Sequence, residues 1–283
     1  MTGMRFGVSM RAVGDDFAAK CRRAEELGYD VITVPDHLGA PAPFPALVAA
    51  AAATERLRVG PMVLNAPFYN PALLARDIES TVAVTGGRFD LGIGAGHMKS
   101  EFDDAGLPWW PAKRRIEYLD HTLTELRRRL GKLPPLLIAG NSEGVLRLAA
   151  EHADIVGFSG LKQAPGRPPG TFQLATPDEL AGRVEFVRSH ATQAQQYNVL
   201  VQKVVVAEDP VPVLDKWHPE YRGEDLLRAP QILAGTVERI TTELRNREQR
   251  FGFDYVTVFG PMMADFAAVI AEFRRPESTR SPA

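Results

Sequence analysis

The sequence lacks several features that mark whole classes of proteins. It contains one cysteine, Cys21, so an intramolecular disulfide is impossible and a cysteine-based metal site is disfavoured. The formal charge of −2 at pH 7 gives no electrostatic reason to expect a nucleic-acid partner. The longest alanine-rich run, at residues 44–60, is interrupted by charge before it reaches membrane-spanning length. Because the first residues also lack the layout of a signal peptide, these absences predict a cytoplasmic protein without membrane contact.

What the chain does contain is a regular alternation of short apolar runs and helical patterns. The apolar runs resemble strands covered on both faces, and they lie at residues 4–10, 31–35, 57–64, 88–94, 136–140, 154–159, 199–207 and 254–259. The helical patterns lie at residues 15–28, 44–56, 71–85, 112–130, 142–152, 177–196, 226–250 and 262–274. Eight β-then-α units with nothing left over predict an α/β fold of the (β/α)8 TIM-barrel type. We expect one domain at residues 1–275 and a flexible tail at 276–283; a doubly wound open sheet is the structural alternative.

Three long irregular segments are expected, at residues 95–111, 160–176 and 208–225. Each follows the C-terminal end of a predicted strand. Barrel enzymes place their active sites on loops at this end, so the position of these segments predicts a catalytic mouth.

The first of these loops begins in a glycine-rich strand end, GIGAGH at residues 92–97. A dinucleotide-binding fingerprint would require a third glycine at the position of His97 and a place in the first strand–turn–helix unit, so that interpretation fails. Two interpretations remain. The missing Cβ atoms either let a flat group lie close to the backbone, or only permit the turn.

Polar residues at two other strand ends are also suited to binding or catalysis. Asp36 and His37 emerge directly from the second strand, and a histidine beside a carboxylate is an acid/base candidate. After the fifth strand, Gly140 and Asn141 form a turn and Ser142 is the expected N-cap of a helix. The free N–H groups at such a helix start favour an anion, although an ordinary capped helix has the same pattern.

Other barrel chemistries fit the sequence less well. The first strand has no His-x-His pair, so we predict no metal. A glycosidase needs two carboxylates at strand ends, and the candidates Glu101 and Glu208 stand some residues beyond their strands.

Five segments in the expected order resemble the luciferase-like monooxygenase superfamily, and specifically its coenzyme F420-dependent branch. They are VPDH at 34–37, GPMVLNAPFYNPALLA at 60–75, GGRFDLGIGAGHMKSE at 86–101, IAGN at 138–141 followed by ADIVGF, and QRFGFDYVTVFG at 249–260. The resemblance covers roughly residues 4–274 and implies a (β/α)8 barrel whose mouth holds F420.

The resemblance also implies roles for individual residues. It places a non-prolyl cis peptide at Met62–Val63, in a bulge against which the deazaflavin would lie. The implied cofactor contacts, to the ring, its ribityl chain and its phosphate, come from Met62, Val63, Asn65, Gly94, Ala95, Gly96, Ser100, Gly140, Asn141 and Ser142. Asp36–His37 matches a pair that lies over the deazaflavin in the sugar-phosphate dehydrogenases of this branch. Those enzymes have a catalytic glutamate where this chain has His97, so sugar-phosphate oxidation is doubtful, and Lys162 falls where they hold a substrate phosphate.

The expected reaction is hydride transfer from reduced F420 to a C=C, C=N or C=O bond of a small organic substrate. Either His37 or His97 would supply the proton, since an unperturbed histidine titrates near neutral pH, and Asp36 would orient His37. Trp109 or Trp110, in a loop bounded by prolines, is expected to line the pocket.

Three other functions stay open from the sequence. One is an FMN-dependent monooxygenase that uses O2 on the same barrel; such relatives often carry longer insertions after the seventh strand than residues 208–225. The others are a non-catalytic flavin-binding barrel and a cofactor-free lyase or hydrolase. Barrels of this family often dimerise, so a homodimer is possible.

Overall fold

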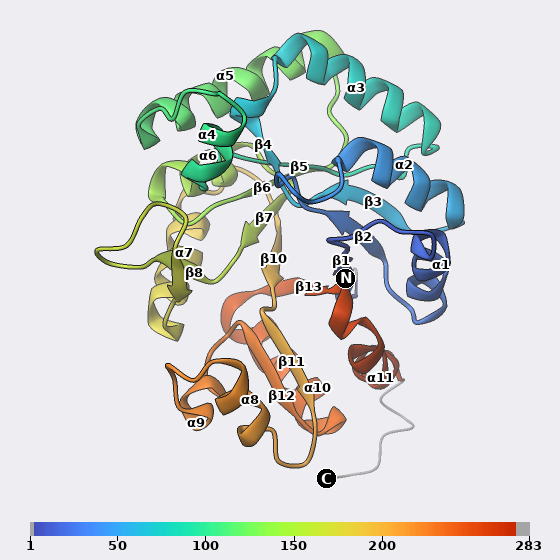
Figure 1. Cartoon of the computed structure of the whole chain (residues 1–283), viewed down its shortest axis with the longest axis vertical. Helices are drawn as coiled ribbons and strands as arrows, with labels where there is room; N and C mark the ends of the chain where they lie inside the picture. Colours follow the sequence, from blue (N-terminus) through green and yellow to red (C-terminus); the bar gives the residue numbers. More distant parts are fainter. Residues whose placement is uncertain (1–2, 276–283) are drawn as a thin grey trace.

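The computed structural model describes residues 3–275, and its main sheet is a parallel barrel (Figure 1). The tail predicted at 276–283 lies outside the described residues. In chain order the barrel strands are β1 (Arg5–Ser9), β2 (Val31–Val34), β3 (Arg58–Pro61), β4 (Leu64–Asn65), β5 (Leu91–Gly94), β6 (Leu136–Ala139), β7 (Ile155–Phe158), β10 (Gln196–Leu200) and β13 (Phe253–Phe259).

The barrel closes through its third strand, which is broken into β3 and β4. The sheet order is β3-β2-β1-β13-β10-β7-β6-β5-β4, so the two halves of this strand lie at opposite ends of the order. A further parallel bridge joins Val59 of β3 to Phe89, just before β5. Because β3 and β4 are two halves of one strand, the nine segments form the eight strands of a barrel, and the predicted TIM barrel is confirmed.

Helices surround the strands on the outside, as Figure 1 shows. They are α1 (Phe17–Glu26), α2 (Pro43–Ala53), α3 (Pro71–Val84), α5 (Ala112–Leu130), α6 (Glu143–His152), α7 (Pro177–His190), α10 (Val237–Phe251) and α11 (Met263–Phe273). Local sequence explains several of their starts. Asn70 caps α3 directly before Pro71, and Thr176 forms a capping box with Glu179 at the start of α7. No helix within residues 3–275 is both long and apolar enough to cross a membrane.

Alternate strand residues face two different apolar regions. Residues such as Val8, Ile32 and Val156 belong to the large core between strands and helices. The positions between them point into the barrel, where a separate cluster contains Val31, Leu137, Ile155 and Tyr255, with Met62, Val63 and Ala139 packed against it. A strand in a barrel is buried on both faces, which is why its sequence is apolar without strict alternation.

The region after β10 differs from the prediction. The strand expected at 199–207 is two strands, because β10 ends at Leu200 and β11 (Lys203–Val206) pairs instead with β12 (Ile232–Gly235) in a separate parallel sheet. The helix expected at 226–250 begins only at Val237, since Pro230 and Gly235 interrupt the helical pattern. The expectation that no segment is left over was therefore wrong.

Short elements also occupy the loops that were expected to be irregular. Residues 95–111 contain α4 (Lys99–Asp104), and 160–176 contain the antiparallel hairpin of β8 (Leu161–Gln163) and β9 (Phe172–Leu174). The segment 208–225 contains α8 (Val211–Trp217) and α9 (Gly223–Leu226). Two 3-10 turns, η1 (Ala66–Phe68) and η2 (Gly260–Met262), follow β4 and β13.

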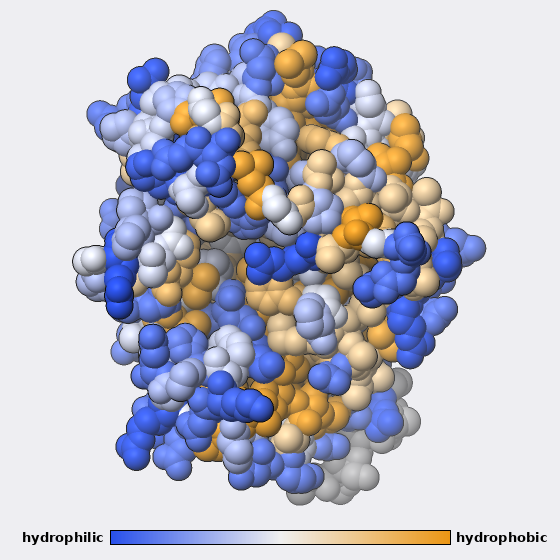
Figure 2. All heavy atoms as spheres, in the orientation of Figure 1, coloured by the Kyte–Doolittle hydropathy of each residue, from blue (hydrophilic) through white to orange (hydrophobic). Residues whose placement is uncertain are grey.

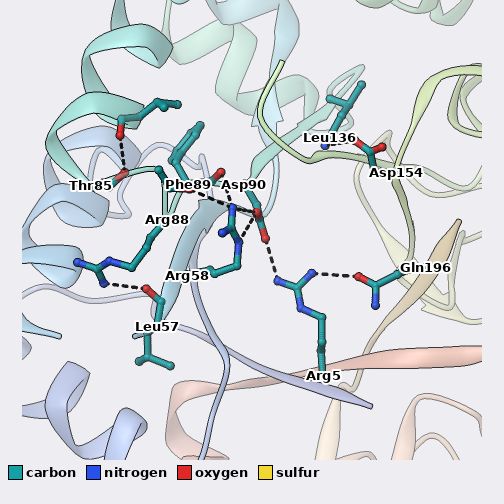
Figure 3. Close-up of polar contacts among 12 residues, drawn as sticks. Arg5, Leu57, Arg58, Thr85, Arg88, Phe89, Asp90, Leu136, Asp154 and Gln196 are labelled. Atoms are coloured by element: carbon teal, nitrogen blue, oxygen red, sulfur yellow. Dashed lines mark hydrogen bonds and ion pairs between the residues drawn. The ribbon is translucent and has the colours of Figure 1, made fainter. Parts of the chain in front are cut away.

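A polar cluster closes the N-terminal end of the barrel (Figure 3). The buried Asp90, directly before β5, accepts hydrogen bonds from Arg5 Nη2 at 2.9 Å and from Arg58 Nε at 2.7 Å. Arg5 also donates to Gln196 at 3.1 Å and lies over the Tyr255 ring, 4.7 Å from its centre. Charged groups fill this end of the barrel and bind one another.

Candidate active site

At the C-terminal end of the barrel, Asp36 ties the second strand to the third. Its Oδ2 accepts a hydrogen bond from the Asn65 backbone N–H at 2.9 Å, and the Tyr69 hydroxyl donates to the same carboxylate. Burial raises the pKa of Asp36, and the two hydrogen bonds oppose part of this shift. Asp36 therefore holds the loop after β2 against the end of β4.

His37 extends from the same loop, and its partner is Glu101. The distance between His37 Nδ1 and Glu101 Oε1 is 2.8 Å. Glu101 lies in the first turn of α4 and is 7% exposed, whereas a quarter of the His37 side chain is exposed. A carboxylate at Nδ1 favours the tautomer that carries its proton there, which leaves Nε2 free for a bound molecule.

The sequence prediction missed this role of Glu101. We expected Asp36 to orient His37, but the carboxyl oxygen of Asp36 instead accepts from Asn65 and Tyr69. Glu101 was considered only as a glycosidase carboxylate. The available signal was its position four residues after His97, at the start of a helical stretch in the glycine-rich loop.

His97 lies beside His37, with their rings edge to face and 5.5 Å apart. Its other side contacts Phe172 of β9, at 5.3 Å between ring centres. The residue is exposed by surface area, yet desolvation, followed by the positive charges of His37 and Arg115, lowers its pKa to about 4. The ring lies between His37 and Phe172, and at neutral pH it is uncharged.

The third strand breaks at a cis peptide between Met62 and Val63, which confirms the prediction made from the family resemblance. Both residues are half-buried and pack on the cluster inside the barrel. The break lies between β3 and β4, at the level where Asn65 pairs with Gly94 of β5.

The glycines of the first loop accommodate this broken strand. A Cβ on Gly92 would collide with the Pro61 carbonyl, and one on Gly94 would lie 3.0 Å from a Val63 methyl. Gly96 has a φ of +77° and faces the Asn65 amide, too close for a Cβ. These glycines thus have an intramolecular reason to be there, in addition to any contact with a ligand.

Two buried polar atoms at the ends of β2 and β4 have no hydrogen-bond partner among the described residues. They are Asn65 Oδ1 at the end of β4 and Thr33 Oγ1 near the end of β2. Thr33 lies between the outward-facing Ile32 and Val34, so its side chain points into the barrel. Buried polar groups normally form hydrogen bonds, so the Asn65 and Thr33 oxygens fit a polar ligand bound at the C-terminal end of the barrel. The residues present are therefore compatible with a bound flavin-like group.

The start of α6 has the form predicted for an anion site. Ser142 is the N-cap, but its side chain makes no capping hydrogen bond, and the backbone N–H groups of Asn141 and Ser142 have no partner within residues 3–275. The Asn141 Oδ1 atom accepts from Ser159 at 2.9 Å and from Arg183 at 3.1 Å. The side-chain amide of Asn141 is thus held in place, while the backbone N–H groups of Asn141 and Ser142 stay available to an anion.

The other predicted residues lie around the mouth with different surroundings. Lys162 of β8 forms an ion pair with Glu179 at 2.6 Å, so its charge already has a partner. Trp109 lies edge-on to Phe102, the neighbour of Glu101, whereas Trp110 packs on Tyr118. Ala95 is half-buried, and Ser100 is exposed in the first turn of α4.

The face shown in the space-filling view carries mixed polar and apolar side chains. Figure 2 shows a recess left of its centre, beside the strands labelled β7 and β10 in the same orientation. Among the described residues, no three His, Cys, Asp or Glu side chains come together in a way that could hold a metal ion.

Comparison with known proteins gives a consistent result. Residues 7–167 match the family model described as luciferase-like monooxygenase. An F420-dependent glucose-6-phosphate dehydrogenase of Intrasporangium calvum is 38% identical over 117 residues, which cover 38% of this chain and 35% of that protein. A 5,10-methylenetetrahydromethanopterin reductase of Archaeoglobus fulgidus is 33% identical over 150 residues, covering 46% of this chain and 45% of that protein. These matches span about a third to a half of the relatives.

A solved structure extends the likeness to the whole fold. An F420-dependent secondary alcohol dehydrogenase in complex with an F420–acetone adduct superposes with a TM-score of 0.74, over 97% of this chain and all of that one. The sequence identity is 17%, so this likeness concerns the fold alone.

Proposed function

Because this chain belongs to the luciferase-like monooxygenase family, we propose that it is an F420-dependent oxidoreductase acting on a small organic substrate. Reduction of a C=C, C=N or C=O bond is the favoured direction. The observation that carries the proposal is the His37–Glu101 pair, at 2.8 Å, beside the broken third strand at the open end of the barrel. The F420-dependent relatives support the choice of cofactor.

The residues that would hold F420 come from three strand ends. Met62, Val63 and Asn65, together with Gly94, Ala95, Gly96 and Ser100, would surround the ring and its ribityl chain. The backbone N–H groups at Gly140, Asn141 and Ser142 would bind the phosphate. When bound, F420 would supply the hydride, which leaves the protein to orient the substrate and deliver one proton.

His37 is suited to be the proton donor. Its Nε2 has no protein partner within the described chain, and the Glu101 carboxylate at Nδ1 fixes the orientation of the ring. Solvent reaches part of the His37 side chain, so the ring can be protonated again after each turnover. His97, whose pKa is lowered to about 4, is neutral at pH 7 and fits a hydrogen-bonding role better than that of an acid.

His97 also affects which substrate the site would accept, because it replaces the catalytic glutamate of the sugar-phosphate dehydrogenases. An uncharged ring next to Phe172 forms an apolar wall, and Lys162 is engaged by Glu179. These features favour a substrate other than a sugar phosphate.

An FMN-dependent monooxygenase is the second candidate, and one observation favours it. The insertion after β10, from β11 through β12, spans residues 203–235 and is larger than the loop predicted at 208–225. This chain therefore does carry an insertion of the kind expected of such monooxygenases after the seventh barrel strand.

Absorbance titration of the purified protein with F420 and, separately, with FMN tests the proposal. We expect saturable F420 binding, and reoxidation of reduced F420 in the presence of an unsaturated or carbonyl substrate. Tight binding of FMN alone, with NADPH-dependent oxygen uptake when a flavin reductase is supplied, would support the monooxygenase instead.

A further inference from the structure

Arg115, in the first turn of α5, is a buried cation without a counter-ion. It is 9% exposed and makes no ion pair with any described residue. Its guanidinium lies 3.7 Å from the centre of the Trp109 ring, and Nη1 donates to the Trp110 carbonyl. Nε is buried without a partner, and no hydrogen bond from Nη2 is present within residues 3–275. Most N–H donors of the Arg115 guanidinium therefore make no hydrogen bond within residues 3–275.

The other buried arginine of the described chain shows what a structural role looks like. Arg247 is 4% exposed, and its Nε donates to Glu243 at 2.7 Å. Its Nη1 and Nη2 donate to the backbone carbonyls of Pro230 and Ile232. Burial of a charge is costly unless it is paired, so Arg247 is satisfied within the fold and Arg115 is not.

Arg115 lies beside the proposed active site. The Trp109 ring beneath it contacts Phe102, which follows the Glu101 that binds His37. The next residue, Ile116, packs on Gly144 in the first turn of α6. The charge of Arg115 is also close enough to contribute to the lowered pKa of His97. The guanidinium donors thus lie against the loop after β5, on a helix whose next residue packs on the helix start proposed to hold a phosphate.

We propose that Arg115 binds an oxyanion, either carboxylate or phosphate, of a molecule held in the mouth of the barrel. A planar guanidinium presents paired N–H donors to such groups. The Trp109 ring below it fixes the orientation of the guanidinium plane. The oxyanion supplies the counter-charge that residues 3–275 do not provide. This inference deepens the proposed function, and rests on it only for the source of the anion, which is either the cofactor tail or the substrate.

The first experiment uses inorganic phosphate as the probe and needs no cofactor. Phosphate is titrated into the full-length protein at constant ionic strength and followed by calorimetry and tryptophan fluorescence. Arg115→Met should weaken saturable binding roughly tenfold to a hundredfold, and Arg115→Lys should weaken it less. Arg114→Met is the matched control, because Arg114 is exposed and lies over Trp110, 4.5 Å from the ring centre. The control should bind phosphate like the wild type.

Two outcomes would overturn the inference. One is the absence of saturable phosphate binding in the wild type. The other is equal binding by Arg115→Met, and a lower melting temperature of that variant would then identify Arg115 as structural. The inference expects a melting temperature at least as high as that of the wild type, since methionine removes an unpaired buried charge.

The second experiment identifies the source of the anion. If F420 affinity falls at least tenfold in Arg115→Met but not in Arg114→Met, the anion belongs to the cofactor. If F420 affinity is unchanged while phosphate binding is lost, the anion belongs to the substrate. A wild type that binds phosphate through Arg115 but not F420 would sink the proposed function and leave the anion site standing.

Discussion

The two ends of this barrel use charge in opposite ways. At the N-terminal end, Asp90 receives hydrogen bonds from Arg5 and Arg58, so the buried carboxylate is fully engaged (Figure 3). At the C-terminal end, Asn65 Oδ1 and Thr33 Oγ1 are buried and have no hydrogen-bond partner in the described part of the chain. Among the described residues, the Asp90 carboxylate at one end of the barrel is thus hydrogen-bonded, whereas these two polar atoms at the other end are not. Buried polar atoms without hydrogen-bond partners, at the C-terminal ends of barrel strands, are typical of a binding site.

Stability and activity should therefore be separable along the axis of the barrel. Substitutions at the N-terminal end should change the free energy of unfolding with little effect on the chemistry. Substitutions at the C-terminal end should do the reverse.

Replacement of His37 by alanine should lower turnover by a factor on the order of 10² to 10⁴, because the proton donor is lost. F420 affinity and the melting temperature should stay close to those of the wild type. The measurement is the rate of reduced-F420 oxidation with whichever substrate the wild-type enzyme uses. His121→Ala, on the outer helix α5, is the control and should keep full activity. Unchanged turnover of His37→Ala would remove this residue from the mechanism.

Asp90→Ala should destabilise the fold by roughly 3–5 kcal/mol, because it leaves Arg5 and Arg58 without their buried counter-ion. Chemical denaturation measures the change in the free energy of unfolding. Glu26→Ala is a matched control, since its ion pair with Arg23 is exposed and should contribute less than about 0.5 kcal/mol. Turnover per folded molecule should persist in both variants. A loss of less than about 1 kcal/mol in Asp90→Ala would contradict the view that this cluster closes the barrel.

Glu101→Gln should lower turnover by a factor of roughly 10 to 10², since the neutral amide pairs less firmly with His37 Nδ1 and the ring is held less well in place. Glu101 acts through His37, so the separate effects on kcat and KM are the decisive readout. The turnover number kcat should fall while the substrate KM changes little. An unchanged kcat, or a loss of activity that follows the loss of folded protein, would assign Glu101 a structural role only.

His97 should produce a small, pH-dependent effect on stability. Its pKa in the folded protein is lowered to about 4, below the ordinary value of 6.5, so the unfolded chain binds more protons between these values. Its contribution to stability is therefore present above pH 6.5 and is lost as the pH falls through about 4. Unfolding curves for the wild type and His97→Asn should converge as the solution is acidified. Histidine NMR titration gives an independent check, and a folded pKa above 6 would contradict the desolvation of this ring.

Local patterns were enough to predict the barrel and the place of its mouth. Strands buried on both faces are apolar along their length, and the helical patterns between them place successive strands in parallel. The positions of Asp36, His37 and the glycine loop at strand ends followed from this alternation. The cis peptide at Met62–Val63 came from family resemblance, and spacing alone would not have predicted it.

Partners distant in the chain were decided only by the tertiary structure. Glu101 is 64 residues from His37, and Asp90 is 85 residues from Arg5, so no local pattern links them. The departure of β11 from the barrel to pair with β12 belongs to the same class. Secondary structure depends on neighbours in sequence, whereas these contacts exist because closure of the barrel brings strand ends together. The alternation along the chain therefore determined the scaffold, and closure of the ring determined which buried polar groups of residues 3–275 are paired and which are not.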